Sequence, residues 1–321
     1  MLRVLVAYDG SECSDKALGD LTRAGMPAEA EAVVFTAGDR WIDEASLADS
    51  DFAELSLRQA METARHAAKK LEGHFPRWQI RPEAVSDSAA WGIVDKVAAW
   101  NPDMVVMGSH GRSAAGRLLF GSVSHSVLTR THCNLRISRG RDGEAHEVAP
   151  LRIMVAFDGS QESETAFDMA LGRYWPKGTH IRLITVIDSK VATAFAQPTG
   201  PIRFWIKNED KHPLDWVERM LSCQKNEIQE RGFTASSEAI KGDPKRVILR
   251  EAEKWGADSL FVGPRGLTGD KRTIAGSVSA SLATHGHCTV EVVHRLWGAA
   301  TCCDSSLREH RACMEEKEVF P

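Results

Sequence analysis

The residues best suited to chemistry in this sequence are glycines, and they occur in the same arrangement twice. Each copy reads Gly-x-x-Gly, then nine residues, then Gly-Ser. A glycine lets the backbone approach a ligand closely because it has no Cβ, and the amide groups that open a helix attract an anion. The pattern therefore predicts two polyphosphate-binding loops. Its glycines are Gly108, Gly111 and Gly121 in the first copy, and Gly263, Gly266 and Gly276 in the second.

Polar side chains beside these glycines could complete each loop. Ser122 and Ser277 follow the last glycine, where a hydroxyl could donate to a phosphate oxygen or cap a helix. Basic side chains that could offset phosphate charge lie inside both loops: Arg112, Arg117, Lys271 and Arg272. A single GxxG is more often a simple turn, but repetition of the whole spacing favours a binding loop. Neither a GxxxxGK[ST] loop nor a GxGxxG fingerprint occurs in the sequence, which disfavours Walker-type and dinucleotide sites.

The two loops belong to an internal repeat that covers most of the chain. RVLVAYDGSECSDKAL at 3–18 matches RIMVAFDGSQESETAF at 152–167, and NPDMVVMGSHGR at 101–112 matches GADSLFVGPRGL at 256–267. The second copy is longer only in the stretch that corresponds to 36–87 of the first. A fixed register around one variable segment indicates a rigid core with one tolerant loop.

Each copy alternates short apolar runs with amphipathic stretches, which predicts an α/β fold with a parallel sheet. In the first copy we expect strands near 2–8, 31–37, 79–85, 103–108 and 133–138, and helices near 12–24, 50–73, 89–100 and 118–130. In the second copy we expect strands near 151–157, 180–187, 233–240, 258–263 and 288–294. The expected organisation is a domain at 1–138, a polar linker at 139–150, a domain at 151–296 and a polar, cysteine-containing tail at 297–321.

The overall composition is that of an ordinary globular protein. The formal net charge is −4, so there is no basic footprint for nucleic acid. The N-terminus lacks the basic region and length of a signal peptide, and no apolar run is long enough for a membrane span, so we expect a cytoplasmic protein. The cysteines number seven and include no CxxC pair, which favours reduced thiols over disulfides or zinc ligands.

With the Asp-Gly-Ser that ends the first strand of each copy, the paired GxxG-x9-GSVS motifs make the chain resemble a tandem universal stress protein of the ATP-binding subgroup. The resemblance covers 2–138 and 151–294. It implies two tandem doubly wound, Rossmann-like domains, each a five-stranded parallel sheet of order 3-2-1-4-5 with helices on both faces. The family pairs its edge strands antiparallel, which implies an internal pseudo-dimer of the two domains and leaves a homodimer open.

The same resemblance implies that an adenine nucleotide lies across the carboxyl ends of strands one and four, which is also the topological switch point of the sheet. The implied contacts in the first copy are Asp9, Ala37, Gly108, Gly111, Arg112, Gly121, Ser122 and Val123. Those in the second copy are Asp158, Val186, Gly263, Gly266, Gly276, Ser277 and Val278. Asp9 and Asp158 also have a purely structural interpretation, because an Asp ahead of Gly-Ser can cap the following helix.

The second copy departs from this pattern in its phosphate loop. Pro264 has no N–H to offer a phosphate, and Leu267 replaces Arg112, for which Arg265 could substitute from two residues earlier. We therefore expect nucleotide binding in both copies, with the first slightly better equipped for phosphate.

Three other features have structural interpretations that we favour. His132-Cys133 and His287-Cys288 recur, but adjacent residues on a strand point to opposite faces, so buried cysteines are favoured over a metal site. Cys302, Cys303 and Cys313 of the tail could bind metal or sense oxidants, although a short solvated helix is favoured. The aromatic-rich segment 188–211 could be a lid, although a loop packing its own side chains is favoured.

The sequence as a whole predicts an ATP-binding regulator of the stress response, with ATP carried together with Mg²⁺. We identify no catalytic residue and no metal site. His110 is the only imidazole in either loop and its counterpart is Arg265, so we expect slow hydrolysis at most. Two alternatives stay open: an ATP-hydrolysing or adenylyl-transferring enzyme of the adenine-nucleotide α-hydrolase-like fold, and a nucleotide-free interaction scaffold.

Overall fold

The computed structural model describes residues 1–38, 50–111, 121–139, 150–189, 214–267 and 274–296. The first half contains β1 (Leu2–Ala7), α1 (Glu12–Leu21), β2 (Ala30–Gly38), α2 (Ser50–His74), β3 (Gln79–Ser86), α3 (Ala89–Trp100), β4 (Met104–Gly108), α4 (Ser122–Arg130) and β5 (Asn134–Ser138). The second half contains β6 (Arg152–Ala156), α5 (Gln161–Leu171), β7 (His180–Ile187), α8 (Asp215–Glu230), β8 (Thr234–Lys241), α9 (Pro244–Trp255), β9 (Ser259–Val262), α10 (Ser277–His285) and β10 (Thr289–Val292).

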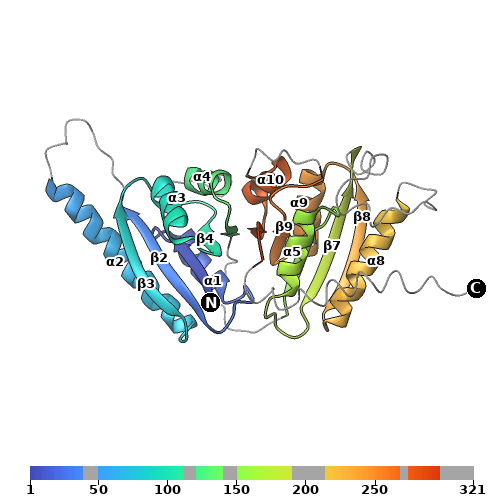
Figure 1. The fold of residues 1–321 in the computed structure, drawn as a ribbon, viewed down its shortest axis with the longest axis horizontal. Coiled ribbons are helices and arrows are strands. Elements are labelled where there is room, and N and C mark those ends of the chain that lie inside the picture. The colour runs from blue at the N-terminus through green and yellow to red at the C-terminus, as the bar shows by residue number, and fades with distance from the viewer. Residues whose placement is uncertain (39–49, 112–120, 140–149, 190–213, 268–273, 297–321) are drawn as a thin grey trace, which may run out of the picture.

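The strands of the described residues form a single ten-stranded sheet of order β3-β2-β1-β4-β5-β10-β9-β6-β7-β8. Each half has the order 3-2-1-4-5 with parallel pairing, as expected. Figure 1 shows the two halves side by side, with α4 and α10 near the centre and α2 and α8 at the outer ends. The predicted fold class is confirmed.

Alternation of side chains along each strand builds two core layers. On β1, Val4 and Val6 pack into the cluster beneath α1 and α2, whereas Leu5 and Ala7 pack into the cluster beneath α3 and α4. Both clusters continue across the centre of the sheet, the first beneath α5 and α8 and the second beneath α9 and α10. Helices therefore cover both faces of the sheet along its whole length.

The halves join edge to edge through β5 and β10, which pair antiparallel in the register Leu135↔Val292, Arg136↔Glu291 and Ile137↔Val290. This is the pairing that the family resemblance implied. It covers two strand edges that would otherwise present unpaired backbone groups.

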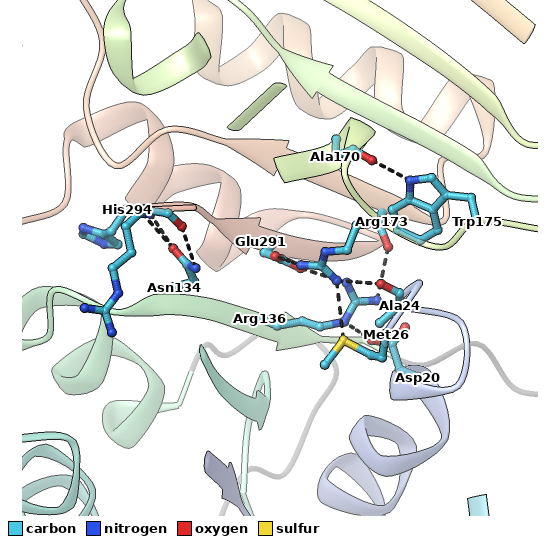
Figure 2. Close-up of polar contacts among 12 residues, drawn as sticks. Asp20, Ala24, Met26, Asn134, Arg136, Ala170, Arg173, Trp175, Glu291 and His294 are labelled. Atoms are coloured by element: carbon cyan, nitrogen blue, oxygen red, sulfur yellow. Dashed lines mark hydrogen bonds and ion pairs between the residues drawn. The ribbon is translucent and has the colours of Figure 1, made fainter. Parts of the chain in front are cut away.

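A buried network of ion pairs, the seam network, crosses this junction (Figure 2). Arg136 donates from Nε to Asp20 Oδ2 at 2.8 Å and from Nη1 to Glu291 Oε2 at 3.1 Å. Arg173, from the second half, also donates to Glu291 and reaches the carbonyl of Ala24 in the first half. Burial lowers the pKa of Arg173 to about 10, although Glu291 opposes the shift. Because buried charges are costly unless they are paired, the network favours one relative position of the halves.

The differences from the predicted elements are confined to their ends. Helix α1 ends at Leu21, short of the expected residue 24, and the chain then turns through Gly25, whose φ is +61°. The expected segment 188–211 and the expected tail lie almost wholly outside the described residues. Among the helices that the structure describes, none has the length and apolar character needed to cross a membrane.

Candidate functional site

In each half, the predicted site residues lie where the sheet order reverses. In the first half β1 is flanked by β2 and β4, and the chain leaves β1 toward Asp9 while β4 ends at Gly108. In the second half β6 ends just before Asp158, and β9 just before Gly263. The carboxyl ends of neighbouring parallel strands meet at one edge of a sheet, so the Asp and the glycine loop of each half are brought together.

The two aspartates hold corresponding positions in the turns after β1 and β6. Asp9 Oδ1 accepts a hydrogen bond from the Ser11 amide at 3.0 Å, and Asp158 Oδ1 accepts one from the Ser160 amide at 3.0 Å. The caps of α1 and α5 are Ser11 and Ser160, whose hydroxyls accept from amides further into the helix. The interpretation of the aspartates as the helix caps is therefore wrong, because the serine two residues later has that role.

The second carboxylate oxygen of each Asp faces the glycine loop. Asp158 Oδ2 accepts from the Leu267 amide at 3.0 Å. A Cβ placed on Gly111 would lie 2.7 Å from Asp9 Oδ2, and one on Gly266 would lie 2.5 Å from Asp158 Oδ2. Any side chain at the second glycine of the motif would displace the carboxylate, so the Asp and this glycine form one structural unit.

The first glycine of each motif packs against the first turn of a helix. A Cβ on Gly108 would lie 3.0 Å from the backbone of Cys13, and one on Gly263 would lie 2.7 Å from the backbone of Glu162. Backbone atoms cannot move aside as the end of a flexible side chain can. The loop after β4 is thereby held against α1, and the loop after β9 against α5.

The two serines of each GSVS segment have different environments. Ser122 and Ser277, the predicted phosphate contacts, are exposed at the start of α4 and α10. Ser124 and Ser279 are buried, and their hydroxyls donate to the carbonyls of Gly108 at 3.0 Å and Pro264 at 2.6 Å. The second serine therefore anchors the helix start to the end of the strand. This role was not predicted from the sequence, although the second serine of GSVS occurs in both copies and could have indicated it.

The open ends of α4 and α10 supply amide groups on the same side as the Asp carboxylates. Gly121 and Gly276 are the caps, and neither helix start has a side-chain cap within the described residues. The amides at such a helix start carry partial positive charge, which favours an anion. The structure thus provides an acceptor group and an anion-attracting group within each half.

Among the positions at which the two halves differ, one pair of side chains is in direct contact in each half. In the first half Cys13 Sγ lies 3.0 Å from His110 Nε2, and His110 Nδ1 lies 3.0 Å from Ser109 Oγ. In the second half Glu162 and Arg265 occupy the positions of Cys13 and His110, and they form an ion pair at 3.4 Å. The sequence predicts Arg265 as a substitute for Arg112, but neither pairing can be foreseen from it, because each one joins a helix to a distant loop.

The remaining predicted contacts have simple placements. Ala37 lies near the end of β2 and is half-buried, whereas Val186 on β7 is 6% exposed. Val123 and Val278 are half-buried against the core beneath α4 and α10. Arg112 lies outside the described residues, as do Arg117, Lys271 and Arg272.

The described residues hold no group of three or more His, Cys, Asp or Glu side chains arranged to bind a metal ion. Cys133 and Cys288, which could have joined neighbouring histidines in a metal site, are buried, outside any disulfide, in the core beneath α3, α4, α9 and α10. Burial also raises the pKa of Cys133. The tail cysteines lie outside the described residues.

The model of the universal stress protein family matches residues 1–139 and 151–294. A universal stress protein of Mycolicibacterium smegmatis is 27% identical over 240 residues, which cover 75% of this chain and 77% of that protein. The crystal structure of a universal stress protein from Archaeoglobus fulgidus matches with a TM-score of 0.63 and 21% identity, covering 91% of this chain and 96% of its own. A family protein from Arabidopsis thaliana, described with AMP bound, is 24% identical and covers 46% of this chain and 93% of its own, with a TM-score of 0.33.

Proposed function

The chain belongs to the universal stress protein family, and we propose that each of its halves binds one ATP molecule, so that the protein is a nucleotide-dependent regulator of the stress response. The observation that carries this proposal is the duplicated arrangement at the strand ends. Twice in one chain, an Asp carboxylate abuts the second glycine of a loop whose far end opens a helix with an exposed serine. A purely structural turn would not need the exposed serine or the open helix start.

The chemistry of ATP matches the two ends of this arrangement. Asp9 and Asp158 would accept hydrogen bonds from hydroxyl or amino groups of the nucleoside, because an ionised carboxylate is an acceptor only. The polyphosphate would lie along the glycine loop toward the starts of α4 and α10, where Ser122 and Ser277 can donate their hydroxyls. Ala37 and Val186, near the ends of the second strands, would border the adenine.

Magnesium would enter each site with the nucleotide. Mg²⁺ keeps several waters and is commonly held by phosphates with one or two carboxylates, so it needs no preformed protein cage. When bound, the ion would offset the negative charge of the phosphates.

We propose at most slow hydrolysis. A general base must reach the attacking water, and His110 already contacts Cys13 and Ser109 through its two ring nitrogens. At the corresponding position, Arg265 cannot act as a base, because a guanidinium stays protonated. At this position the two halves therefore share no residue that could activate water. The protein would switch by binding nucleotide, in the cytoplasm, with the two halves acting as an internal pair.

The proposal is tested on the purified full-length chain. Acid extraction followed by chromatography should release an adenine nucleotide, and Mg·ATP should raise the melting temperature of the emptied protein. Gly111→Val and Gly266→Val should each remove one site, because their side chains would displace the neighbouring carboxylate. No extracted nucleotide and no thermal shift would instead support the scaffold alternative. A turnover rate well above background that Asp9→Ala abolishes would support the enzyme alternative.

A further inference from the structure

A chain of three polar side chains lines the glycine loop of the first half. Cys13 lies on the first turn of α1, and its Sγ is 3.0 Å from His110 Nε2. The other ring nitrogen, Nδ1, is 3.0 Å from Ser109 Oγ, and Ser109 is buried with 4% of its surface exposed. The side chains come from two elements that only the fold brings together, since α1 and the end of β4 are far apart in sequence.

This order of groups is the one that activates a nucleophile. A nucleophile within hydrogen-bond reach of a base, with the base oriented by a third group, is the general arrangement of covalent catalysis. The Ser109 hydroxyl oxygen can accept a hydrogen bond from the Nδ1–H group of His110, which leaves Nε2 unprotonated and able to accept the proton of the Cys13 thiol. Cys13 is only half-buried, so a small reagent can reach it.

We propose that Cys13 is a modification site, at which a hydroperoxide oxidises the thiol to a sulfenic acid with His110 as the base. The sulfur attacks the distal peroxide oxygen, the O–O bond breaks and a new S–O bond forms. The thiol proton passes to His110 Nε2 and then to the leaving alkoxide or hydroxide. The cysteine is oxidised, and the peroxide is reduced to an alcohol or to water.

The need for a base follows from the surroundings of the thiol. Burial raises the pKa of Cys13, and although Lys16 opposes the shift, Glu12 and Asp9 reinforce it. The thiol therefore stays protonated near neutral pH, and the thiolate must form during the reaction. His110 is placed to take that proton.

The other described cysteines lack this arrangement. Cys133 and Cys288 are buried. Cys223 on α8 is half-buried like Cys13, and its pKa is raised by burial together with the charges of Glu227 and Glu230. Among the described residues no imidazole contacts its sulfur. Cys223 is therefore a matched internal control, of similar exposure and without the base.

The second half excludes the same reaction at its own loop. Glu162 and Arg265 replace the thiol and the imidazole with a carboxylate and a guanidinium, neither of which reacts with peroxide. Oxidation would consequently act on one half only. This consequence rests on the proposed nucleotide binding: an added oxygen at Cys13, against Gly108 and near Asp9, would weaken the first ATP site and leave the second unchanged.

The test uses the full chain with Cys302, Cys303 and Cys313 changed to Ser, treated with hydrogen peroxide while dimedone traps sulfenic acid. Peptide mass spectrometry then gives a rate for each cysteine. We expect Cys13 to be labelled about tenfold or more faster than Cys223, since general-base assistance contributes at least that much. His110→Gln should lower the Cys13 rate to that of Cys223, whereas Arg265→Gln, at the matching position of the other half, should leave it unchanged.

Equal rates at Cys13 and Cys223 in the otherwise native chain would overturn the inference, as would a Cys13 rate that His110→Gln does not alter. The ratio of the Cys13 and Cys223 labelling rates is measured without any substitution in the loop. It therefore tests the inference even if His110→Gln does not fold. Saturating Mg·ATP should slow the labelling of Cys13 and not that of Cys223. If Cys13 is labelled faster than Cys223 while Mg·ATP neither slows that labelling nor raises the melting temperature, the proposal of nucleotide binding is wrong and the proposal of a reactive Cys13 is supported.

Discussion

The two strand-end sites share a backbone plan and differ in the side chains that line it. In both, an Asp carboxylate meets a glycine, and a buried serine ties the last helix to the strand before the loop. The first site then has Cys13, His110 and Ser109, which are neutral or titratable, whereas the second has the ion pair of Glu162 and Arg265. The shared features are those that the backbone geometry demands, so the differences mark where the halves can diverge in chemistry.

The two halves differ at a pair of contacting positions, and not at either position alone. Cys13 and His110 contact each other, and their counterparts Glu162 and Arg265 also contact each other, so the halves differ here by a contacting pair of side chains. A difference at this pair can give the two sites different responses to the same ligand.

The largest effect that we predict concerns the seam network, whose buried ion pairs fix the position of one half relative to the other. Glu291→Gln would leave Arg136 and Arg173 buried with one counter-charge fewer. Breaking a buried ion pair in this way costs about 3–5 kcal/mol, measured as the free energy of unfolding in denaturant. Glu54→Gln, which removes an exposed i,i+4 pair with Arg58, is the control and should cost less than about 1 kcal/mol. A loss from Glu291→Gln as small as the control's would refute the role of the network.

The next effect separates the two sites directly. Asp9→Ala should weaken ATP binding in the first half and Asp158→Ala in the second, each by about thirtyfold, because a hydrogen bond to a charged group contributes about 2 kcal/mol. Calorimetric titration with Mg·ATP would measure both sites in each variant. The unchanged half is the internal control. Equal weakening of both sites by either variant would show that the halves do not bind independently.

A smaller effect concerns pH at the junction of the halves. Burial lowers the pKa of His294 to about 4, with His132 and Arg265 adding to the shift. The unfolded chain takes up a proton near pH 6.5 and the folded chain does not, so stability is present above that pH and is lost as the pH falls toward 4. We expect this group to remove about 1–2 kcal/mol of unfolding free energy between pH 7 and pH 5. His294→Gln should reduce the pH dependence by that amount, and an unchanged dependence would count against the buried neutral imidazole.

The smallest predicted effect comes from exchanging the divergent pair. Cys13→Glu with His110→Arg gives the first half the ion pair of the second and should narrow the difference between the two ATP affinities by up to about threefold, a change below 1 kcal/mol, while Pro264 and Leu267 maintain the rest of the difference. The double variant should also lose peroxide sensitivity in the first half. Calorimetry and dimedone labelling measure the two outcomes. Affinities that stay as far apart as in the unaltered protein would show that residues other than this pair set the difference.

Much of this architecture was predictable because it depends on local pattern. The short apolar run LRVLVA and the amphipathic stretch at 50–73 predicted a strand and a helix to within a few residues, and the internal repeat supplied the same pattern a second time. The pairing of β5 with β10 was available only through the family resemblance. Apolar edge strands need a partner, but nothing in the sequence alone chooses that partner.

The parts that the sequence did not reveal all join distant residues. Two such features depend on how the helices and turns pack against the sheet. They are the contact of Cys13 with His110 and the network around Arg136, Arg173 and Glu291. The capping interpretation of Asp9 failed for a local reason, because the serine after the glycine is better placed to accept from the helix amides. The spacing of the glycines predicts the loop of each half, whereas the contacts of its side chains depend on the fold.

The most direct test of two nucleotide sites in one chain is the stoichiometry of ATP binding. The full-length protein, emptied of nucleotide, would be titrated with Mg·ATP in a calorimeter, alongside Gly111→Val, Gly266→Val and the double variant. Two ATP molecules per chain, one for each single variant and none for the double variant would agree with the account. A native stoichiometry of zero, or full occupancy in the double variant, would contradict it.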